Sequence, residues 1–337
     1  MRMQSPATVS TVLDAVGVGA DDIAACVPLT GGTYNTVTRV TLTDGRDWVV
    51  KIPPPSTAPG MRYERDLLVN EVTFYAEAAA RNVAVPHVVH SVLDPGAATG
   101  PYLVMSTCSG QPWSEAAATM TDGEERRLRH ELGRLVGHLH ADTGPEGFGY
   151  PAQALGPLAP AWRQAFTAMT DAVLADAETY RVRLPRQTDR IRALLAAAAP
   201  VLDDVTRPVL VHFDLWQGNL LVDGEPGART VGAIVDGERM FWGDPVADFV
   251  SLALLGNVEK DEEFLAGYAA GPGGAVEFDA SVRLRLALYR CYLYLIMLVE
   301  TVPRRTPAEQ REWVRREVEP QLESALTDVE SVLRTRG

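Results

Sequence analysis

Residues 209–224 read VLVHFDLWQGNLLVDG and place His212, Asp214 and Asn219 between two short apolar runs. Apolar runs of this length are typical of buried strands, so the polar side chains occupy the loop that joins them. A structural loop needs one such polar residue for its local hydrogen bonds. Two polar residues five positions apart admit a second interpretation, in which Asp214 handles a proton and the amide oxygen of Asn219 holds a metal ion. The rest of the chain decides between the two.

A predicted hairpin brings a third oxygen-bearing side chain to the same place. The segments 220–222 and 231–235 are apolar and flank the turn-like stretch DGEPGART, which indicates two antiparallel strands. Asn219 then precedes the first strand and Asp236 follows the second, so both lie at the open end of the hairpin. Amide and carboxylate oxygens suit Mg²⁺, which binds substrate phosphates. We therefore predict Asn219 and Asp236 as Mg²⁺ ligands, and Asp214, which the metal does not need, as the catalytic base.

The lysines provide a second signal. Only two of the 31 basic side chains are lysines, and one of them, Lys51, ends the apolar strand GRDWVVKIP. An ammonium group there can pair with nucleotide phosphates. Glu71 lies on the apolar face of the next predicted helix, where an unpaired carboxylate would be costly. Lys51 is its natural partner, with Glu64 on the same face as the alternative carboxylate. Lys51 and Glu71 thus join Asp214 as predicted catalytic residues.

These parts together are the layout of phosphoryl transfer in kinase-like folds, which use a base aspartate, a metal-binding asparagine and a second metal-binding aspartate. Backbone N–H groups of the GGTYNT turn can cover phosphates. The segment 105–108 is expected to link two lobes and to bind the purine through backbone groups. The predicted cofactors are Mg²⁺ and ATP or GTP as phosphoryl donor. The predicted nucleotide-binding residues are Gly31, Gly32, Thr33, Asn35, Lys51, Ser106 and Cys108.

The motifs GGTYN, VVKI, HFDLWQGN, IVDGE and GDPVADF, with the helix glutamate, resemble those of the aminoglycoside phosphotransferase family of small-molecule kinases. The resemblance covers nearly the whole chain. It implies an α+β, bilobal protein-kinase-like fold with a small β-rich N-lobe containing one main helix and a larger, mainly helical C-lobe. In one departure, most relatives have glycine where this chain has Phe213, which puts the local packing in question. Fructosamine-type kinases also show the DLW-x-GN pattern, so the motif does not choose the substrate.

The predicted division places a nucleotide-binding lobe at 1–108 and a catalytic and acceptor-binding lobe at 109–337. In the first lobe, strands surround one helix over 62–82. His212 is expected to be packed and hydrogen-bonded, and Asp244 and Asp248 to hold the loop and a helix start. Helical patterns in the second lobe cover 161–180, 186–199, 245–270, 281–300 and 307–334.

The amino-acid composition limits the kinds of molecule that the protein is expected to bind and the compartment in which it is expected. The net charge of −13 argues against nucleic acid as a partner. The longest apolar run is broken by Arg290 and is too short for a bilayer, and no signal peptide pattern is present. The cysteines Cys26, Cys108 and Cys291 are scattered and odd in number, which favours the reducing cytoplasm. We expect a cytoplasmic monomer or homodimer that binds neither nucleic acid nor membranes.

The acceptor is predicted to be a small molecule with a hydroxyl group. Residues 109–337 carry 24 basic and 34 acidic side chains, a net of −10, which is compatible with a cationic acceptor. The resemblance therefore favours phosphorylation of an antibiotic; a primary metabolite such as a sugar, fructosamine, amino alcohol or nucleoside is the alternative, and a non-catalytic nucleotide-binding regulator is a remoter one. Carboxylates expected to pair with a polycation are Asp171, Asp176, Glu178 and Glu300.

Overall fold

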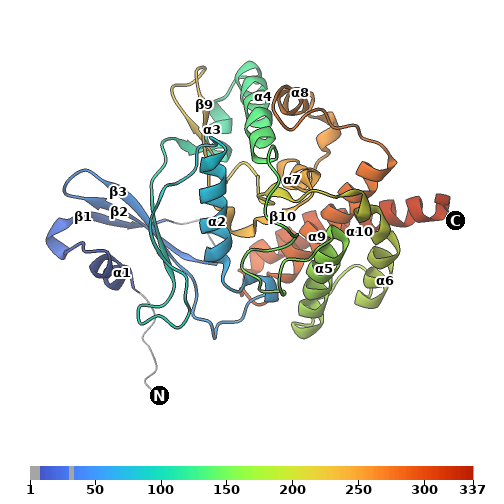
Figure 1. Ribbon diagram of the computed structural model, residues 1–337, viewed down its shortest axis with the longest axis horizontal. Helices are drawn as coiled ribbons and strands as arrows, with labels where there is room; N and C mark the ends of the chain where they lie inside the picture. Colours follow the sequence, from blue (N-terminus) through green and yellow to red (C-terminus); the bar gives the residue numbers. More distant parts are fainter. Residues whose placement is uncertain (1–7, 30–33, 337) are drawn as a thin grey trace.

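The computed structural model describes residues 8–29 and 34–336 (Figure 1). Its N-terminal part is a five-stranded antiparallel sheet in the order β1-β2-β3-β5-β4, with the main helix α2 beside it. Most of the remaining chain is helical and lies on the other side of α2 (Figure 1). The strands and helices of this part are α1 (Val9–Ala15), β1 (Ile23–Pro28), β2 (Thr36–Leu42), β3 (Asp47–Ile52), α2 (Leu67–Ala80), β4 (Val88–Val92) and β5 (Tyr102–Ser106).

The central strand β3 positions Lys51. Its residues pair with β2 on one side and β5 on the other, so that Lys51 lies opposite Val37 and Leu103. Side chains alternate between the two faces of a strand, so Val50 points away from Lys51, into a small core on the other face. The short helix α1, which the sequence patterns did not predict, covers that core with Val12 and begins at the N-cap Thr8.

The main helix begins later than the apolar pattern predicts. Residues Arg62–Glu64 form a separate 3₁₀ turn, η2, and Asp66 adopts a left-handed conformation with φ of 59° before α2 starts at Leu67. A left-handed residue breaks the helical path, which shortens the predicted helix at its N-terminal end. The change matters because it directs η2 toward the C-terminal part, where Glu64 and its neighbours form ion pairs.

The C-terminal part contains two small sheets among its helices. In one sheet β7 pairs with β10, and in the other β8 lies between β6 and β9. The predicted hairpin is present, with Leu220 opposite Ile234. The elements are β6 (Gln111–Pro112), α3 (Trp113–Ala116), α4 (Asp122–Leu139), α5 (Trp162–Thr179), α6 (Thr188–Ala198), β7 (Val209–Val211), β8 (Leu220–Asp223), β9 (Thr230–Ile234), β10 (Phe241–Gly243), α7 (Asp248–Leu252), α8 (Glu262–Ala270), α9 (Ala280–Val299) and α10 (Ala308–Arg336).

The single helical stretch predicted for 245–270 is wrong. The chain forms a 3₁₀ turn at Pro245–Ala247, the short helix α7, a second 3₁₀ turn and then α8. The break follows from local chemistry, because Leu255 adopts φ of 61° and the side chain of Asp261 caps the first turn of α8. Within the described residues, no helix is both long and apolar enough to cross a membrane.

The main hydrophobic core contains residues from both sides of the predicted lobe boundary. Leu68 and Phe74 of α2 belong to the same buried cluster as Leu132 of α4 and Tyr292 of α9. The chain leaves the five-stranded sheet at Ser106, and β6 then pairs with β8. The helix that carries Glu71 is therefore held against the C-terminal part by continuous apolar packing.

Candidate active site

The loop after β7 carries Asp214 on an unusual backbone. Val211 of β7 pairs with Phe241 of β10, and two residues later Phe213 adopts the left-handed φ of 62°. That region disfavours residues with a Cβ by about 1–2 kcal/mol, which explains why glycine is usual there. Phe213 compensates by burying its ring, which lies 5.0 Å from the ring of Phe241 and 5.5 Å from that of Tyr292.

Asp248 holds this backbone in place. Its carboxylate accepts hydrogen bonds from the backbone N–H of His212 at 3.1 Å and of Phe213 at 2.6 Å. His140 Nε2 lies 2.9 Å from the same carboxylate, and the buried His212 has its own Nε2 3.0 Å from the carbonyl of Val235. His212 and Asp248 thus have the structural roles expected of them. The left-handed turn at Phe213, which Asp248 holds in place, sets the position of Asp214.

The open end of the hairpin brings Asn219 and Asp236 to the same loop. The Asn219 side-chain nitrogen donates to the backbone carbonyl of Asp214 at 2.9 Å, so the amide oxygen is the atom that remains for a cation. Asp236 follows β9 in a left-handed conformation with φ of 62°. Its backbone N–H donates to the hydroxyl of Tyr75 on α2, which ties the end of the hairpin to the helix that carries Glu71.

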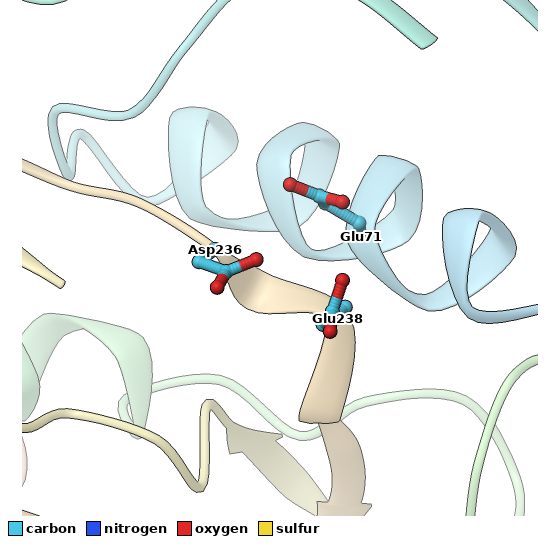
Figure 2. Close-up of side chains that lie close together, drawn as sticks. All are labelled: Glu71, Asp236 and Glu238. Carbon is cyan, nitrogen blue, oxygen red and sulfur yellow. The ribbon is translucent and has the colours of Figure 1, made fainter. Parts of the chain in front are cut away.

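Lys51 lies at the centre of three carboxylates. Its Nζ is 2.7 Å from Glu71 Oε2, 2.6 Å from Asp236 Oδ1 and 2.8 Å from Glu238 Oε2. Figure 2 shows Glu71 on α2 facing the segment after β9 that carries Asp236 and Glu238. One ligand oxygen from each of the three carboxylates lies within 4.8 Å of the others, and the Lys51 ammonium group is the cation between them. Asp236, which also follows the hairpin of Asn219, is the member of this set that fits the predicted Mg²⁺ site.

The charges in this cluster shift the pKa values of its members. Burial alone would lower the pKa of Lys51, but the carboxylates of Asp236, Glu238 and Glu71 outweigh it and hold that pKa well above its ordinary value. Burial raises the pKa of Glu71 to about 7, against the opposing effect of Lys51. The pKa of Asp236 is lowered because the attraction of Lys51 exceeds the penalty of burial. The lysine therefore stays charged and compensates the carboxylates around it.

The alternative partner for Lys51 has a different role. Glu64 bonds to Arg304, which lies beyond α9, and its second oxygen accepts from the backbone N–H of Met61 at 2.7 Å. The predicted pairing of Lys51 with Glu71 is therefore the one observed. Asn35 also reaches the cluster, because its side-chain nitrogen donates to Glu238 at 2.7 Å.

The remaining predicted nucleotide residues lie at the end of the sheet or outside the described part of the chain. Ser106 ends β5, and its N–H already donates to the carbonyl of His87 at 2.8 Å. Cys108 follows the strand and is half-buried. Gly31, Gly32 and Thr33 lie outside the described residues.

Sequence reasoning missed a charged side chain at the predicted base. Arg239 Nε lies 3.7 Å from Asp214 Oδ2, and Arg239 Nη2 donates to Glu300 at 2.9 Å. Burial raises the pKa of Asp214, while the nearby guanidinium of Arg239 lowers it. The only sequence signal was the place of Arg239 three residues after Asp236, next to a predicted metal ligand.

The backbone conformation at Phe213 leads to a prediction about stability. Phe213→Ala and Phe213→Gly both remove the buried ring, and loss of such a ring typically costs about 3–5 kcal/mol. Only glycine also relieves the left-handed strain, so we expect the glycine variant to be more stable than the alanine variant by about 1 kcal/mol. Urea unfolding of the two variants measures the difference. An alanine variant as stable as the glycine variant would contradict the strain.

The chain is similar to one known protein family and to several solved structures. Residues 25–287 match the model described as the phosphotransferase enzyme family. A candidate fructosamine-3-kinase from Thermobifida fusca YX-ER1 superposes with a TM-score of 0.61 and 18% identity, covering 95% of this chain and 99% of the other. At such identity the likeness shows the fold.

Two further structures have the same fold. The macrolide 2'-phosphotransferase from Brachybacterium faecium, as apoenzyme, has a TM-score of 0.57 and 19% identity over 93% of this chain and 98% of its own. The ADP-bound aminoglycoside phosphotransferase APH(2'')-Ib has a TM-score of 0.60 and 14% identity over 96% and 99%. The acceptors named for these three proteins differ, although the fold is shared.

Proposed function

The chain belongs to the phosphotransferase enzyme family, and from this premise we propose that it transfers the γ-phosphate of ATP or GTP to a hydroxyl of a small molecule with the help of Mg²⁺. The resemblance and the kinase-like α+β fold expected from the sequence are confirmed, and the protein is a small-molecule phosphotransferase. One observation carries the proposed mechanism: Lys51, Glu71 and Asp236 meet beside the loop of Asp214 and Asn219.

The roles follow from the atoms available. Asp214 accepts or orients the hydroxyl proton of the acceptor, and Asn219 and Asp236 hold Mg²⁺ through oxygen atoms. Bound Mg²⁺ supplies charge neutralisation at the phosphates. Lys51 pairs with the phosphates and is kept in place by Glu71. Positioning and electrostatic stabilisation do most of the catalytic work in such a site.

Lys51 has to change partners during the cycle. It bonds to Asp236 and Glu238 as well as to Glu71, and the first of these is a proposed metal ligand. With Mg-nucleotide bound, Asp236 would be a metal ligand, and Lys51 would pair with Glu71 and with phosphate oxygens. Glu238 would remain bonded to Asn35, its present partner besides Lys51, or would be a further oxygen ligand of the metal.

The nucleotide is proposed to occupy the side of the five-stranded sheet that faces the hairpin. Residues 1–108 then form the nucleotide-binding lobe, and 109–337 the catalytic and acceptor-binding lobe. Gly31, Gly32 and Thr33, which lie outside the described residues, stay predicted to bind the phosphates together with Asn35. Because the Ser106 N–H is occupied, the purine is expected to meet the carbonyl of Ser106 and the backbone of Cys108.

The acceptor is proposed to be an antibiotic, with a primary metabolite as the second candidate. Two of the three similar structures carry antibiotic phosphotransferase names, and the third carries the name of a fructosamine kinase, which is the observation that favours the second. A non-catalytic regulator is disfavoured, because the lysine, the base and both metal ligands are all present. Three free cysteines support a cytoplasmic location.

A transfer assay tests this proposal. The protein is incubated with Mg²⁺ and ATP or GTP and a panel of aminoglycosides, macrolides, nucleoside antibiotics, fructosamines and choline, and products are read by mass spectrometry. We expect one class to gain a single phosphoryl group, and EDTA to abolish the reaction because the oxygen ligands need their cation. A protein that binds neither nucleotide and phosphorylates no member of the panel would refute the assignment.

A further inference from the structure

An ion pair restrains the carboxylate of the predicted base. Among residues 8–29 and 34–336, only Arg239 forms an ion pair or hydrogen bond with the Asp214 carboxylate, with Nε 3.7 Å from Oδ2. The backbone N–H of Asp214 donates to His212 Nδ1 at 3.1 Å, and its carbonyl accepts from Asn219 at 2.9 Å. These bonds fix the backbone but do not restrain the side-chain torsions. The pair with Arg239 is therefore the contact that selects the direction of the carboxylate.

The backbone that carries Arg239 is packed tightly against α2. Arg239 ends the 3₁₀ turn η5 (Gly237–Arg239). Gly237 lies so close to α2 that a Cβ at this position would be 2.3 Å from a ring carbon of Phe74, a contact that only glycine avoids. The backbone carbonyl of Glu238 accepts a hydrogen bond from the Asn70 side chain at 3.1 Å. Both contacts anchor η5, so the arginine side chain extends from a fixed point.

A second carboxylate holds the guanidinium group itself. Arg239 Nη2 donates to Glu300 at 2.9 Å, and Glu300 lies 3.3 Å from Arg304 Nη1. Arg304 in turn bonds to Glu64 of η2. The side chains of Arg239, Glu300 and Arg304 are 11%, 17% and 8% exposed, so solvent ions screen these pairs only weakly. The arginine therefore has a restrained side chain as well as a fixed backbone.

The contact at Asp214 is the more open end of this series of ion pairs. The Asp214 side chain is 21% exposed, more than those of Arg239 and Glu300. Glu300 already supplies Arg239 with a carboxylate at hydrogen-bond distance, so the second contact at 3.7 Å is not needed to compensate the buried guanidinium. Arginine suits such a double contact, because its planar fork presents N–H donors in fixed directions. A lysine at this position would keep the charge but not those directions.

We propose that Arg239 is a positioning residue of the transfer reaction, which holds the carboxylate of Asp214 in the direction of the acceptor hydroxyl, and that Glu300 fixes Arg239. The inference rests on the proposed phosphotransferase function and adds two side chains that set its rate. The ion pair engages Oδ2 and leaves Oδ1 of Asp214 to accept the hydrogen bond of the hydroxyl. Misplacement of a catalytic group by about 1 Å can cost about a hundredfold in rate. The restraint therefore acts on kcat and not on nucleotide binding.

The first experiment compares two variants that each remove an arginine from a buried ion pair. Arg239→Met releases Asp214. Arg229→Met is the matched control, because Arg229 is 3% exposed and lies 3.2 Å from the buried Glu124, at the turn end of the β8–β9 hairpin and opposite to the proposed metal ligands. We expect both variants to melt at a lower temperature than the wild type. Only Arg239→Met should lose kcat, by about a hundredfold, with the KM for nucleotide unchanged. Steady-state transfer to the best acceptor of the panel and thermal unfolding measure the two properties.

Several results would overturn the inference. An equal loss of kcat in Arg229→Met would show that activity follows stability, and wild-type kcat in Arg239→Met would show that the base needs no restraint. A raised KM for nucleotide at unchanged kcat would place Arg239 with the phosphate-binding side chains instead. If Arg239→Met does not fold, Arg239→Lys replaces it, with a smaller loss of kcat expected because the charge is kept. Failure of the proposed function is distinct, because it would appear in the wild type as no transfer to any member of the panel.

The second experiment tests whether Arg239 acts through Asp214. The kcat values of the wild type, Asp214→Asn, Arg239→Met and the double variant form a double-mutant cycle, with the slow turnover read by mass spectrometry. Residues that act as one unit are not additive, so Arg239→Met should lower kcat only slightly further in the Asp214→Asn background. Losses that multiply in the double variant would show that Arg239 acts independently of the base, and the inference would then be wrong.

Discussion

Asp214→Asn is expected to reduce kcat by about a thousandfold to ten-thousandfold while leaving nucleotide affinity nearly intact, because the carboxylate handles the acceptor proton and does not hold the metal. Asp214→Ala should be at least as inactive. The fold should survive, since Arg239 keeps its bond to Glu300 at 2.9 Å when the charge at Asp214 is removed. Steady-state transfer and nucleotide titration measure the two effects separately.

The control for this prediction is an aspartate on the same hairpin. Asp223 ends β8 and is exposed, so Asp223→Asn should retain wild-type kcat. If Asp214→Asn turned over at the wild-type rate, the assignment of the base would be wrong. A loss of nucleotide affinity equal to the loss of kcat would instead place Asp214 with the metal ligands.

Lys51→Met is expected to affect both stability and catalysis. The substitution leaves the carboxylates of Glu71, Asp236 and Glu238 within 4.8 Å of one another without the cation between them. Breaking a buried ion pair by removing one partner typically costs about 3–5 kcal/mol. Loss of the phosphate-binding charge should also lower kcat by about a hundredfold or more, as loss of a preorganised electrostatic contact does.

Added Mg²⁺ distinguishes this mechanism from a simple packing defect. Three carboxylate ligands freed of their lysine should bind the divalent cation, so MgCl₂ should raise the melting temperature of Lys51→Met more than that of the wild type. Lys260, the only other lysine, is exposed, and Lys260→Met should change neither property. A Lys51→Met protein that matches wild-type stability without metal would contradict the charge balance described for this cluster.

These two predictions concern a site whose parts come from both sides of the predicted lobe boundary. Lys51 and Glu71 precede residue 108, whereas Asp214 and Asp236 follow it. The continuous core between α2 and the C-terminal helices holds the two sets together without nucleotide. The site is therefore expected to be largely preformed, with the exchange of partners at Lys51 as its main rearrangement.

The sequence predicted the parts of the site that depend on local geometry. Asn219 and Asp236 flank one hairpin, so alternation along two short strands is enough to place them at the same end, and the observed pairing of Leu220 with Ile234 confirms that hairpin. The pairing of Lys51 with Glu71 could be predicted from the energetic cost of burying a charge, because a carboxylate on an apolar helix face requires a partner. Helix boundaries were less certain, since single left-handed residues such as Asp66 leave no trace in hydrophobic periodicity.

Only the tertiary structure decided what surrounds the base. Glu64 and Arg304 are 240 residues apart in the chain, and their bond forms because the tertiary structure brings the segment after α9 beside η2. The tertiary structure also places Arg239 between Asp214 and Glu300, which gives both carboxylates an arginine partner. The amino-acid composition gives the number of such charges but not which of them are paired. Pairing depends on distances of a few ångströms, and long-range packing sets those distances, not spacing along the sequence.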